Sequence, residues 1–122
     1  MQRICPTRTW LDMGIPLCLS SDAPSMPWWD PQSTLFCSLA RYTASGKACS
    51  PDQALTIDEA MYAHTMAGAY ADFAENVKGS LEPGKLADLI IWHNDPYTAV
   101  LEDIPFLTVD LTMVGGKVVH EA

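Results

Sequence analysis

Apolar residues in the first part of the chain follow helical spacing and then form one short continuous run. Residues 8–13 have the composition of a helix end, and Gly14 supplies a stop signal. The apolar run 17–19 predicts a strand buried on both faces, as in parallel sheets. The polar residues 20–22 follow at the carboxyl end of this strand. A helix, a buried strand and a polar tip in this order indicate an αβ unit.

The next element is predicted to be a helix that follows an irregular loop. Three prolines in residues 23–33 exclude regular structure there, because proline lacks an N–H donor and restricts the residue before it. Ser33 or Thr34 is then expected to cap a helix that runs through Tyr42.

Two capping-box patterns follow. The first is at residues 50–53, where Pro51 occupies the first helical position. The second is at residues 56–59, and apolar residues at helical spacing continue from it to about Ala71. The second pattern therefore predicts one continuous helix.

After about residue 76 the pattern changes to short strands separated by turns. Residues 81–84 have the Pro and Gly positions of a type II turn, and residues 89–92 have the composition of a buried strand. Two strand-like runs, 111–114 and 117–120, flank Gly115-Gly116 and predict a hairpin with a primed turn.

Length and composition restrict the class of protein. With 122 residues, 48% of them hydrophobic, the chain can form a core but is too short for a complete (β/α)₈ barrel of roughly 200–250 residues. The net charge of −8 disfavours nucleic acids and anionic membranes as partners. No apolar run approaches a membrane span, and the first residues lack a signal-peptide pattern, so a cytoplasmic location is the default expectation.

The four cysteines are far apart and form no C-x-x-C pair. Cys18 and Cys37 have apolar neighbours and are predicted to be small buried side chains with free thiols. A small secreted protein held by disulfides is the alternative interpretation of the same residues.

Asp22 is the strongest candidate for chemistry. A carboxylate at the carboxyl end of a barrel strand can bind a divalent metal or accept a proton from metal-bound water. The alternative is that Asp22 accepts backbone N–H groups in the turn before Pro24. Trp28 and Trp29 in the following loop are candidates to line a substrate pocket, or else they pack the loop onto the rest of the fold.

The histidines give no metal motif, because none has a partner at H-x-H or H-x-x-x-H spacing. His64 lies on the apolar face of its predicted helix and is expected to be a packed, hydrogen-bonded core residue. His93 follows a strand, and His120 is near the end of the chain. Asp88, at the start of a strand, is expected to make a structural polar contact.

Four segments together resemble the amidohydrolase superfamily, and more narrowly the amidohydrolase 3 group of predicted metal-dependent hydrolases. Residues 79–91, GSLEPGKLADLII, are similar to a segment near the C-terminus of these enzymes, and residues 111–119, LTMVGGKVV, are similar to their closing hairpin. Residues 12–31 resemble the region of the eighth barrel strand, and residues 56–71 resemble the helix that follows it.

This resemblance implies an α/β fold. Residues 1–76 would form the last strand and helices of a (β/α)₈ TIM barrel, and residues 77–122 the C-terminal strands of a small composite β-sandwich. It also implies hydrolysis of C–N bonds in small amide-type molecules by water activated on a divalent metal, with zinc as the expected ion. Asp22 matches the family carboxylate at the end of strand eight, which handles the proton and can touch the metal.

The other metal ligands of the family belong to earlier strands and have no counterpart in this sequence. They are the His-x-His of strand one, a carboxylate or lysine on strand four, and histidines on strands five and six. A catalytic zinc typically takes three protein ligands, so we expect the isolated chain to hold no metal and to be inactive. The chain is thus interpreted as the C-terminal segment of an amidohydrolase.

The same interpretation predicts partners. A strand built for neighbours on both sides exposes unpaired edges when it is alone. We therefore expect self-association, or a second polypeptide that supplies the N-terminal barrel strands. The alternative function is a non-enzymatic binding or interaction module, derived from a truncated amidohydrolase, that self-associates through exposed strand edges.

Overall fold

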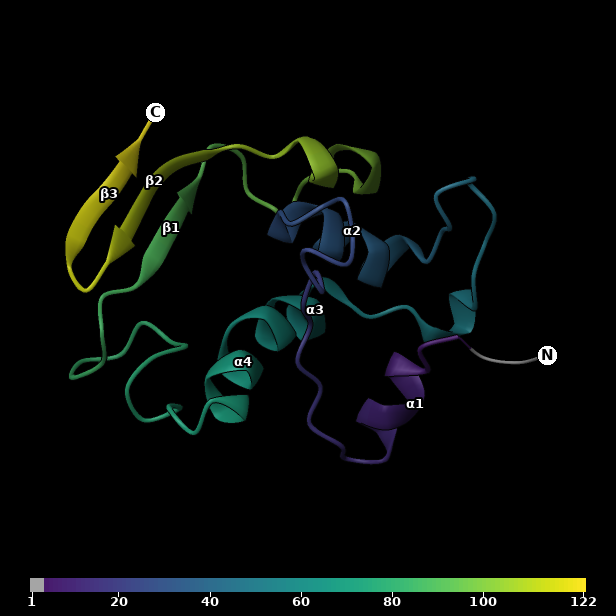
Figure 1. The fold of residues 1–122 in the computed structure, drawn as a ribbon, viewed down its shortest axis with the longest axis horizontal. Helices are drawn as coiled ribbons and strands as arrows, with labels where there is room; N and C mark the ends of the chain where they lie inside the picture. The colour runs from purple at the N-terminus through teal and green to yellow at the C-terminus, as the bar shows by residue number, and fades with distance from the viewer. Residues whose placement is uncertain (1–3) are drawn as a thin grey trace.

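The computed structural model of the chain describes residues 4–122, and it contains a helical part followed by a small antiparallel sheet (Figure 1). Nothing between residues 4 and 122 is a helix long and apolar enough to cross a membrane. The elements in chain order are α1 (Thr7–Asp12), α2 (Pro31–Ala40), η1 (Pro51–Gln53), α3 (Ile57–His64), α4 (Met66–Ala71), β1 (Leu89–Trp92), η2 (Leu101–Phe106), β2 (Val109–Val114) and β3 (Lys117–Glu121).

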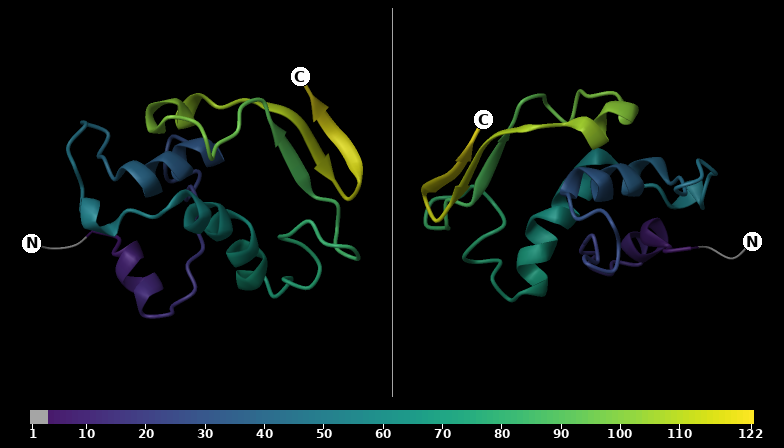
Figure 2. Two further views of the ribbon diagram at one scale, coloured as in Figure 1. Left: turned by 180° about the vertical axis from the view of Figure 1, so that it is seen from behind. Right: turned by 45° about the horizontal axis from the view of Figure 1, so that its top comes forward.

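The helices and the sheet lie at opposite ends of the molecule, and the chain passes between them more than once (Figure 2). After β1 the chain returns to the helices, where the 3₁₀ helix η2 packs against α2, and then it enters β2. This crossing connects the two parts.

Helix α2 begins earlier than predicted. Asp30 is its N-cap, with an Oδ1 that accepts the Ser33 backbone N–H at 2.7 Å, and Pro31 takes the first helical position. The predicted cap at Ser33 or Thr34 is therefore wrong, because the Asp-Pro pair that ends the loop is itself a helix start signal. The helix ends at Ala40, where Arg41 adopts a left-handed backbone.

One of the two predicted capping boxes is present. The Thr56 side chain accepts the Glu59 N–H, and the Glu59 carboxylate accepts the Thr56 N–H at 2.9 Å, which confirms the box at α3. At Ser50 the box is absent, and a single 3₁₀ turn follows. The reason is that the Gln53 side chain turns to α1 instead, where its Oε1 accepts the Thr9 N–H at 3.0 Å.

The long helix predicted after Thr56 is broken into α3 and α4. Thr65 separates them with φ −118° and ψ −86°, and its hydroxyl donates to the Met61 carbonyl at 2.8 Å. A threonine bonded back to the carbonyl four residues earlier often bends a helix, which is the reason that helical spacing alone missed the break.

The apolar run 17–19 forms no strand, so this prediction is not met within residues 4–122. The Leu19 N–H donates to the Ala63 carbonyl at 3.1 Å, which holds the segment in extended form beside α3. A strand requires neighbours whose backbone groups pair with its own, and none of the described strands lies beside this run.

Cys18 and Cys37 are exposed free thiols, so the prediction that they are buried is wrong.

The sheet has the order β1-β2-β3, and both pairs are antiparallel. The predicted hairpin is confirmed, with Gly115 and Gly116 at φ +56° and +78°, the positive values that a type I′ turn requires. Asp88 Oδ1 accepts the Gly115 N–H at 2.6 Å, which confirms the structural contact expected for Asp88.

The strand predicted at residues 89–92 exists as β1, but it is not buried. Ile90 and Ile91 are 41% and 50% exposed. An apolar run predicts burial only when other layers cover the sheet, and the described residues cover this one only in part.

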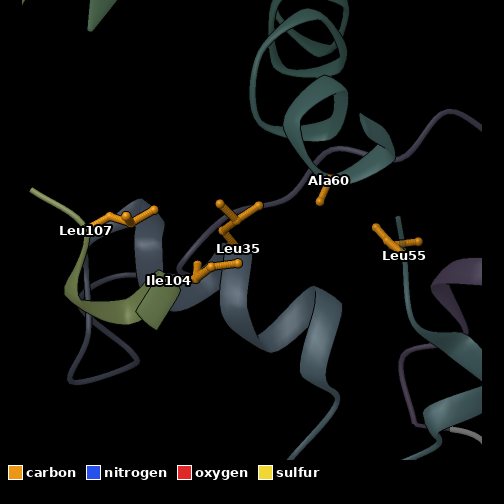
Figure 3. Close-up of a cluster of buried hydrophobic side chains, with 5 residues drawn as sticks. All are labelled: Leu35, Leu55, Ala60, Ile104 and Leu107. Carbon is orange, nitrogen blue, oxygen red and sulfur yellow. The ribbon is translucent and has the colours of Figure 1, made fainter. Parts of the chain in front are cut away.

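The buried core is small and joins the two halves of the chain (Figure 3). Leu35 of α2 packs with Ile104 and Leu107 from the η2 region, while Leu55 and Ala60 extend the cluster at the start of α3. Many large apolar side chains lie outside it, including Phe73 at 94% exposed. The core accounts for the contact between η2 and the helices but leaves much apolar surface open.

Candidate active site

Asp22 lies in a turn that directly follows the extended segment beside α3. Its backbone is left-handed, with φ +55°, and its carbonyl accepts the Ser25 N–H at 2.8 Å. Non-glycine residues adopt this conformation rarely, although aspartate does so more readily than most. The turn is therefore formed by the backbone of Asp22.

The carboxylate of Asp22 is exposed and forms no hydrogen bond to any of residues 4–122. The Asp22 N–H donates to Ser20 Oγ at 3.3 Å, and the Ala23 N–H donates to Ser21 Oγ at 3.4 Å, so the two serine hydroxyls are the side-chain acceptors of this turn. The structural role considered for the Asp22 carboxylate is thus absent, which leaves its oxygens available for another partner.

The residues that the structure describes do not amount to a metal centre. Within residues 4–122 there is no group of three or more His, Cys, Asp or Glu side chains placed to hold a metal ion. A catalytic zinc takes three protein ligands and a water, and Asp22 can supply one. The donor set of these residues alone therefore does not fit such a metal.

Trp28 and Trp29 lie in the loop before α2, at 49% and 79% exposed. Such exposure argues against the alternative that the Trp29 ring packs the loop onto the described part of the fold. Neither tryptophan lines the hollow between the helices and the sheet or the smaller one beside residues 58–63.

The three histidines have different surroundings. His64 is half-buried, and its Nε2 is buried with no hydrogen-bond partner among residues 4–122, so the hydrogen bond expected for it is missing. Burial lowers the pKa of His64 below its ordinary value. His93 Nδ1 lies 3.0 Å from Asp110 Oδ1 on the surface of the sheet, while His120 is exposed on β3.

Sequence reasoning missed a hollow of about 540 Å³ between the helices and the sheet. It lies between α3, α4, the loop 78–81 and β1, and His64 is one of its lining residues. The signal for it was weak, since it consisted of small residues such as Gly68 and Gly79 near a histidine assigned to the core.

Comparisons with known proteins agree with the resemblance seen in the sequence. The model of the amidohydrolase family matches residues 1–120. The chain is 33% identical over 119 residues to the N-substituted formamide deformylase of Arthrobacter pascens, and 32% identical over 119 residues to the imidazolonepropionase of Geobacillus kaustophilus. Each match covers 98% of this chain.

The fold has a solved counterpart. The crystal structure of an amidohydrolase from Thermotoga maritima superposes with a TM-score of 0.68 and 20% identity, and the superposition covers 92% of this chain and 24% of that protein. This chain spans 22% and 26% of the lengths of the deformylase and the imidazolonepropionase. Because the family model matches nearly every residue, the chain belongs to the amidohydrolase family.

Proposed function

We propose that the chain is the C-terminal part of a metal-dependent hydrolase that cleaves C–N bonds of small amide-type molecules. Members of the family are generally metal-dependent. Residues 1–76 form the end of a TIM barrel in this proposal, and residues 77–122 contribute strands to a β-sandwich. The proposal is supported by the match of the family model over residues 1–120. It is also supported by Asp22, whose carboxylate has no partner among the described residues at the turn after residues 17–20.

Asp22 is the residue of this chain that acts in catalysis under the proposal. An exposed carboxylate on a fixed turn can accept a proton from an attacking water and return it to a leaving amine, a role that contributes roughly 10²–10⁴-fold in rate. In the complete enzyme a divalent metal, zinc in this proposal, would be held mainly by residues outside this chain, and its chemistry would be to lower the pKa of the attacking water. Trp28 and Trp29 would then contribute to the substrate pocket once the rest of the barrel is beside them.

The chain alone is inactive under this proposal. Its histidines are not placed to complete a metal site with Asp22, so the other ligands must come from a longer or second polypeptide. The substrate class follows from the relatives: the name of the Arthrobacter protein describes removal of formyl groups from N-substituted formamides.

A chimera tests the role of Asp22. The matched stretch of the Arthrobacter deformylase is replaced by this chain, and turnover of an N-substituted formamide is measured with metal present. Asp22→Asn is expected to lower kcat by about 10²-fold or more with a small change in KM. Asp58→Asn, at an exposed carboxylate on the first turn of α3, is the matched control and should leave kcat unchanged. Equal activity of the two variants would remove Asp22 from the mechanism.

A non-enzymatic interaction module is the second candidate, and the exposed surface favours it. The chain exposes 8249 Å², whereas a folded monomer of 13.4 kDa is expected to expose roughly 6,500 Å². Metal analysis and light scattering on the purified chain separate the candidates. The module is supported if the purified chain self-associates, binds no metal and shows no hydrolysis either alone or in the chimera. Activity in the chimera supports the hydrolase.

A further inference from the structure

The turn around Asp22 uses its own oxygens to accept the N–H groups beside the Asp22 carboxylate. Ser20 Oγ accepts the Asp22 N–H at 3.3 Å, and Ser21 Oγ accepts the Ala23 N–H at 3.4 Å. The Asp22 carbonyl accepts the Ser25 N–H at 2.8 Å. The N–H groups of residues 22, 23 and 25 are therefore all engaged by oxygens other than those of the carboxylate.

Pro24 removes the donor that an aspartate in a turn ordinarily uses. The carboxylate of such an aspartate typically accepts the backbone N–H two residues further along the chain. Two residues after Asp22 is Pro24, which has no N–H. Together with the engaged groups, this proline leaves the Asp22 carboxylate without a free backbone donor among residues 22–25. The local sequence SSDAPS thus keeps this carboxylate unpaired within its own turn.

The backbone conformation of Asp22 needs support from its neighbours. Its φ of +55° is left-handed, which is unfavourable for a residue with a Cβ and persists only where surrounding contacts hold it. Upstream, the Leu19 N–H donates to the Ala63 carbonyl at 3.1 Å and anchors the segment to α3. Beyond this anchor, the side-chain hydrogen bonds that restrain residues 20–23 are those of Ser20 and Ser21.

We propose that Ser20 and Ser21 are positioning residues for Asp22, because their hydroxyls hold its left-handed turn and keep its carboxylate free for proton transfer. When either hydroxyl is removed, the backbone can relax to an ordinary conformation and displace the carboxylate. The N–H group that is freed then competes for the carboxylate oxygens. The inference rests on the proposed function for the catalytic role of Asp22, whereas its conformational part concerns this chain alone.

Nuclear magnetic resonance on the chain itself tests the conformational part. A positive φ brings the N–H and Hα protons of one residue unusually close, so they give a strong intraresidue nuclear Overhauser effect. We expect this strong effect at Asp22 in the parent chain, and its loss in Ser20→Ala and in Ser21→Ala. Ser20→Thr and Ser21→Thr keep a hydroxyl acceptor and should retain the effect.

Ser25→Ala is the matched control. It removes a hydroxyl from the same turn, but Ser25 donates its backbone N–H to Asp22, and alanine keeps that group. The effect at Asp22 should therefore be unchanged in this variant, and circular dichroism checks that every variant is folded. A weak effect at Asp22 in the parent chain would overturn the proposal, and a strong effect in either alanine variant would overturn it for that serine.

The catalytic consequence is measured in the deformylase chimera. Ser20→Ala and Ser21→Ala should each lower kcat about tenfold with little change in KM, because misplacing a catalytic group by about 1 Å can cost about 10²-fold in rate. The threonine variants should restore most of kcat, and Ser25→Ala should leave it unchanged. A loss that appears mainly in KM would contradict the positioning role.

A double-mutant cycle shows whether the serines act through Asp22. In an Asp22→Asn background, Ser20→Ala should have no further effect on kcat, because the group that it positions is already lost. A further loss in that background would overturn the proposal. The proposed function fails separately: unchanged kcat in Asp22→Asn removes the catalytic role of Asp22. A loss of kcat in Asp22→Asn without a loss in either alanine variant retains that role and overturns the positioning by the serines.

Discussion

Arg8 Nη1 donates to both carboxylate oxygens of Glu59, at 2.6 and 2.7 Å. This pair connects α1 to the start of α3, across 51 residues of sequence. The same carboxylate closes the capping box by accepting the Thr56 N–H. Glu59 thus stabilises the start of its own helix and holds a second helix in place. The hydrogen bond from Arg8 is the main cause that lowers the pKa of Glu59 below its ordinary value.

Glu59→Gln should lower the free energy of unfolding at neutral pH. It should also make this free energy change less when the pH is lowered. Glutamine can still close the box, so the change isolates the ion pair. The folded-state pKa of Glu59 is depressed, so its contribution is present above the ordinary value of 4.5 and is lost as pH falls through the lower folded value. The free energy of unfolding in urea, measured at pH 7 and about pH 3, should differ less in the variant than in the parent protein.

Asp58→Asn is the control for this comparison, because Asp58 is an exposed carboxylate on the same helical turn. If the free energy of unfolding falls equally between neutral and acidic pH in the parent protein and in Glu59→Gln, the Arg8–Glu59 pair does not couple folding to pH.

Gly79→Ala should destabilise the contact between α4 and the loop that follows it. A Cβ at Gly79 would lie 2.7 Å from the Ala69 Cβ, and the backbone has φ +96°. Overpacking costs about 1–3 kcal/mol, and a positive φ adds about 1 kcal/mol for a residue other than glycine.

Gly84→Ala separates these two costs. Gly84 has φ +97°, and a Cβ added there would have no neighbouring atom within 4 Å, so alanine meets the conformational cost alone. Urea unfolding of the two variants should place Gly79→Ala below Gly84→Ala in stability. Equal losses would mean that the loop moves away from α4 without cost.

Leu35→Ala should cost about 2–4 kcal/mol of unfolding free energy. Leu35 is 2% exposed and lies at the centre of the cluster that joins α2 to η2 (Figure 3). Phe106→Ala removes a larger side chain that is 80% exposed, and it should change stability by less than about 0.5 kcal/mol. Urea denaturation followed by circular dichroism measures both. A larger loss at Phe106 would show that this ring is covered in solution.

The sequence predicted those elements whose signals are local. The Thr56 box depends on residues within one turn, and the hairpin at Gly115-Gly116 depends on two residues with positive φ, so both are present as expected. The break at Thr65 depends on a side chain bonding back to Met61, which competes with a helical pattern that continues past it. The box at Ser50 failed because the partner of Gln53 is Thr9, which is 44 residues away in sequence.

The burial of these strand-like segments could not be predicted in the same way. It depends on which other parts of the fold cover them, and the sequence pattern of a segment does not contain that information. Residues 17–19 and 89–92 have the composition of fully covered strands, yet the first run forms no strand and the second is half exposed. For the site, the sequence singled out Asp22 but held no indication of its left-handed backbone. The hollow between the helices and the sheet arises where α3, α4 and β1 meet, so no single segment could reveal it.

Val119 is an extra residue of β3 opposite the Thr112–Met113 step, and this irregularity affects how the sheet can pair with other sheets. A sheet with two regular edges can stack head to tail, each molecule offering one edge to the next, and such contacts lead to filaments when they do not close. Here the β3 edge carries an extra residue in its pairing with β2, and such bulges disfavour pairing of an edge with a further strand. Repeated edge pairing is therefore disfavoured, so the exposed apolar surface of this chain does not by itself commit it to fibre formation.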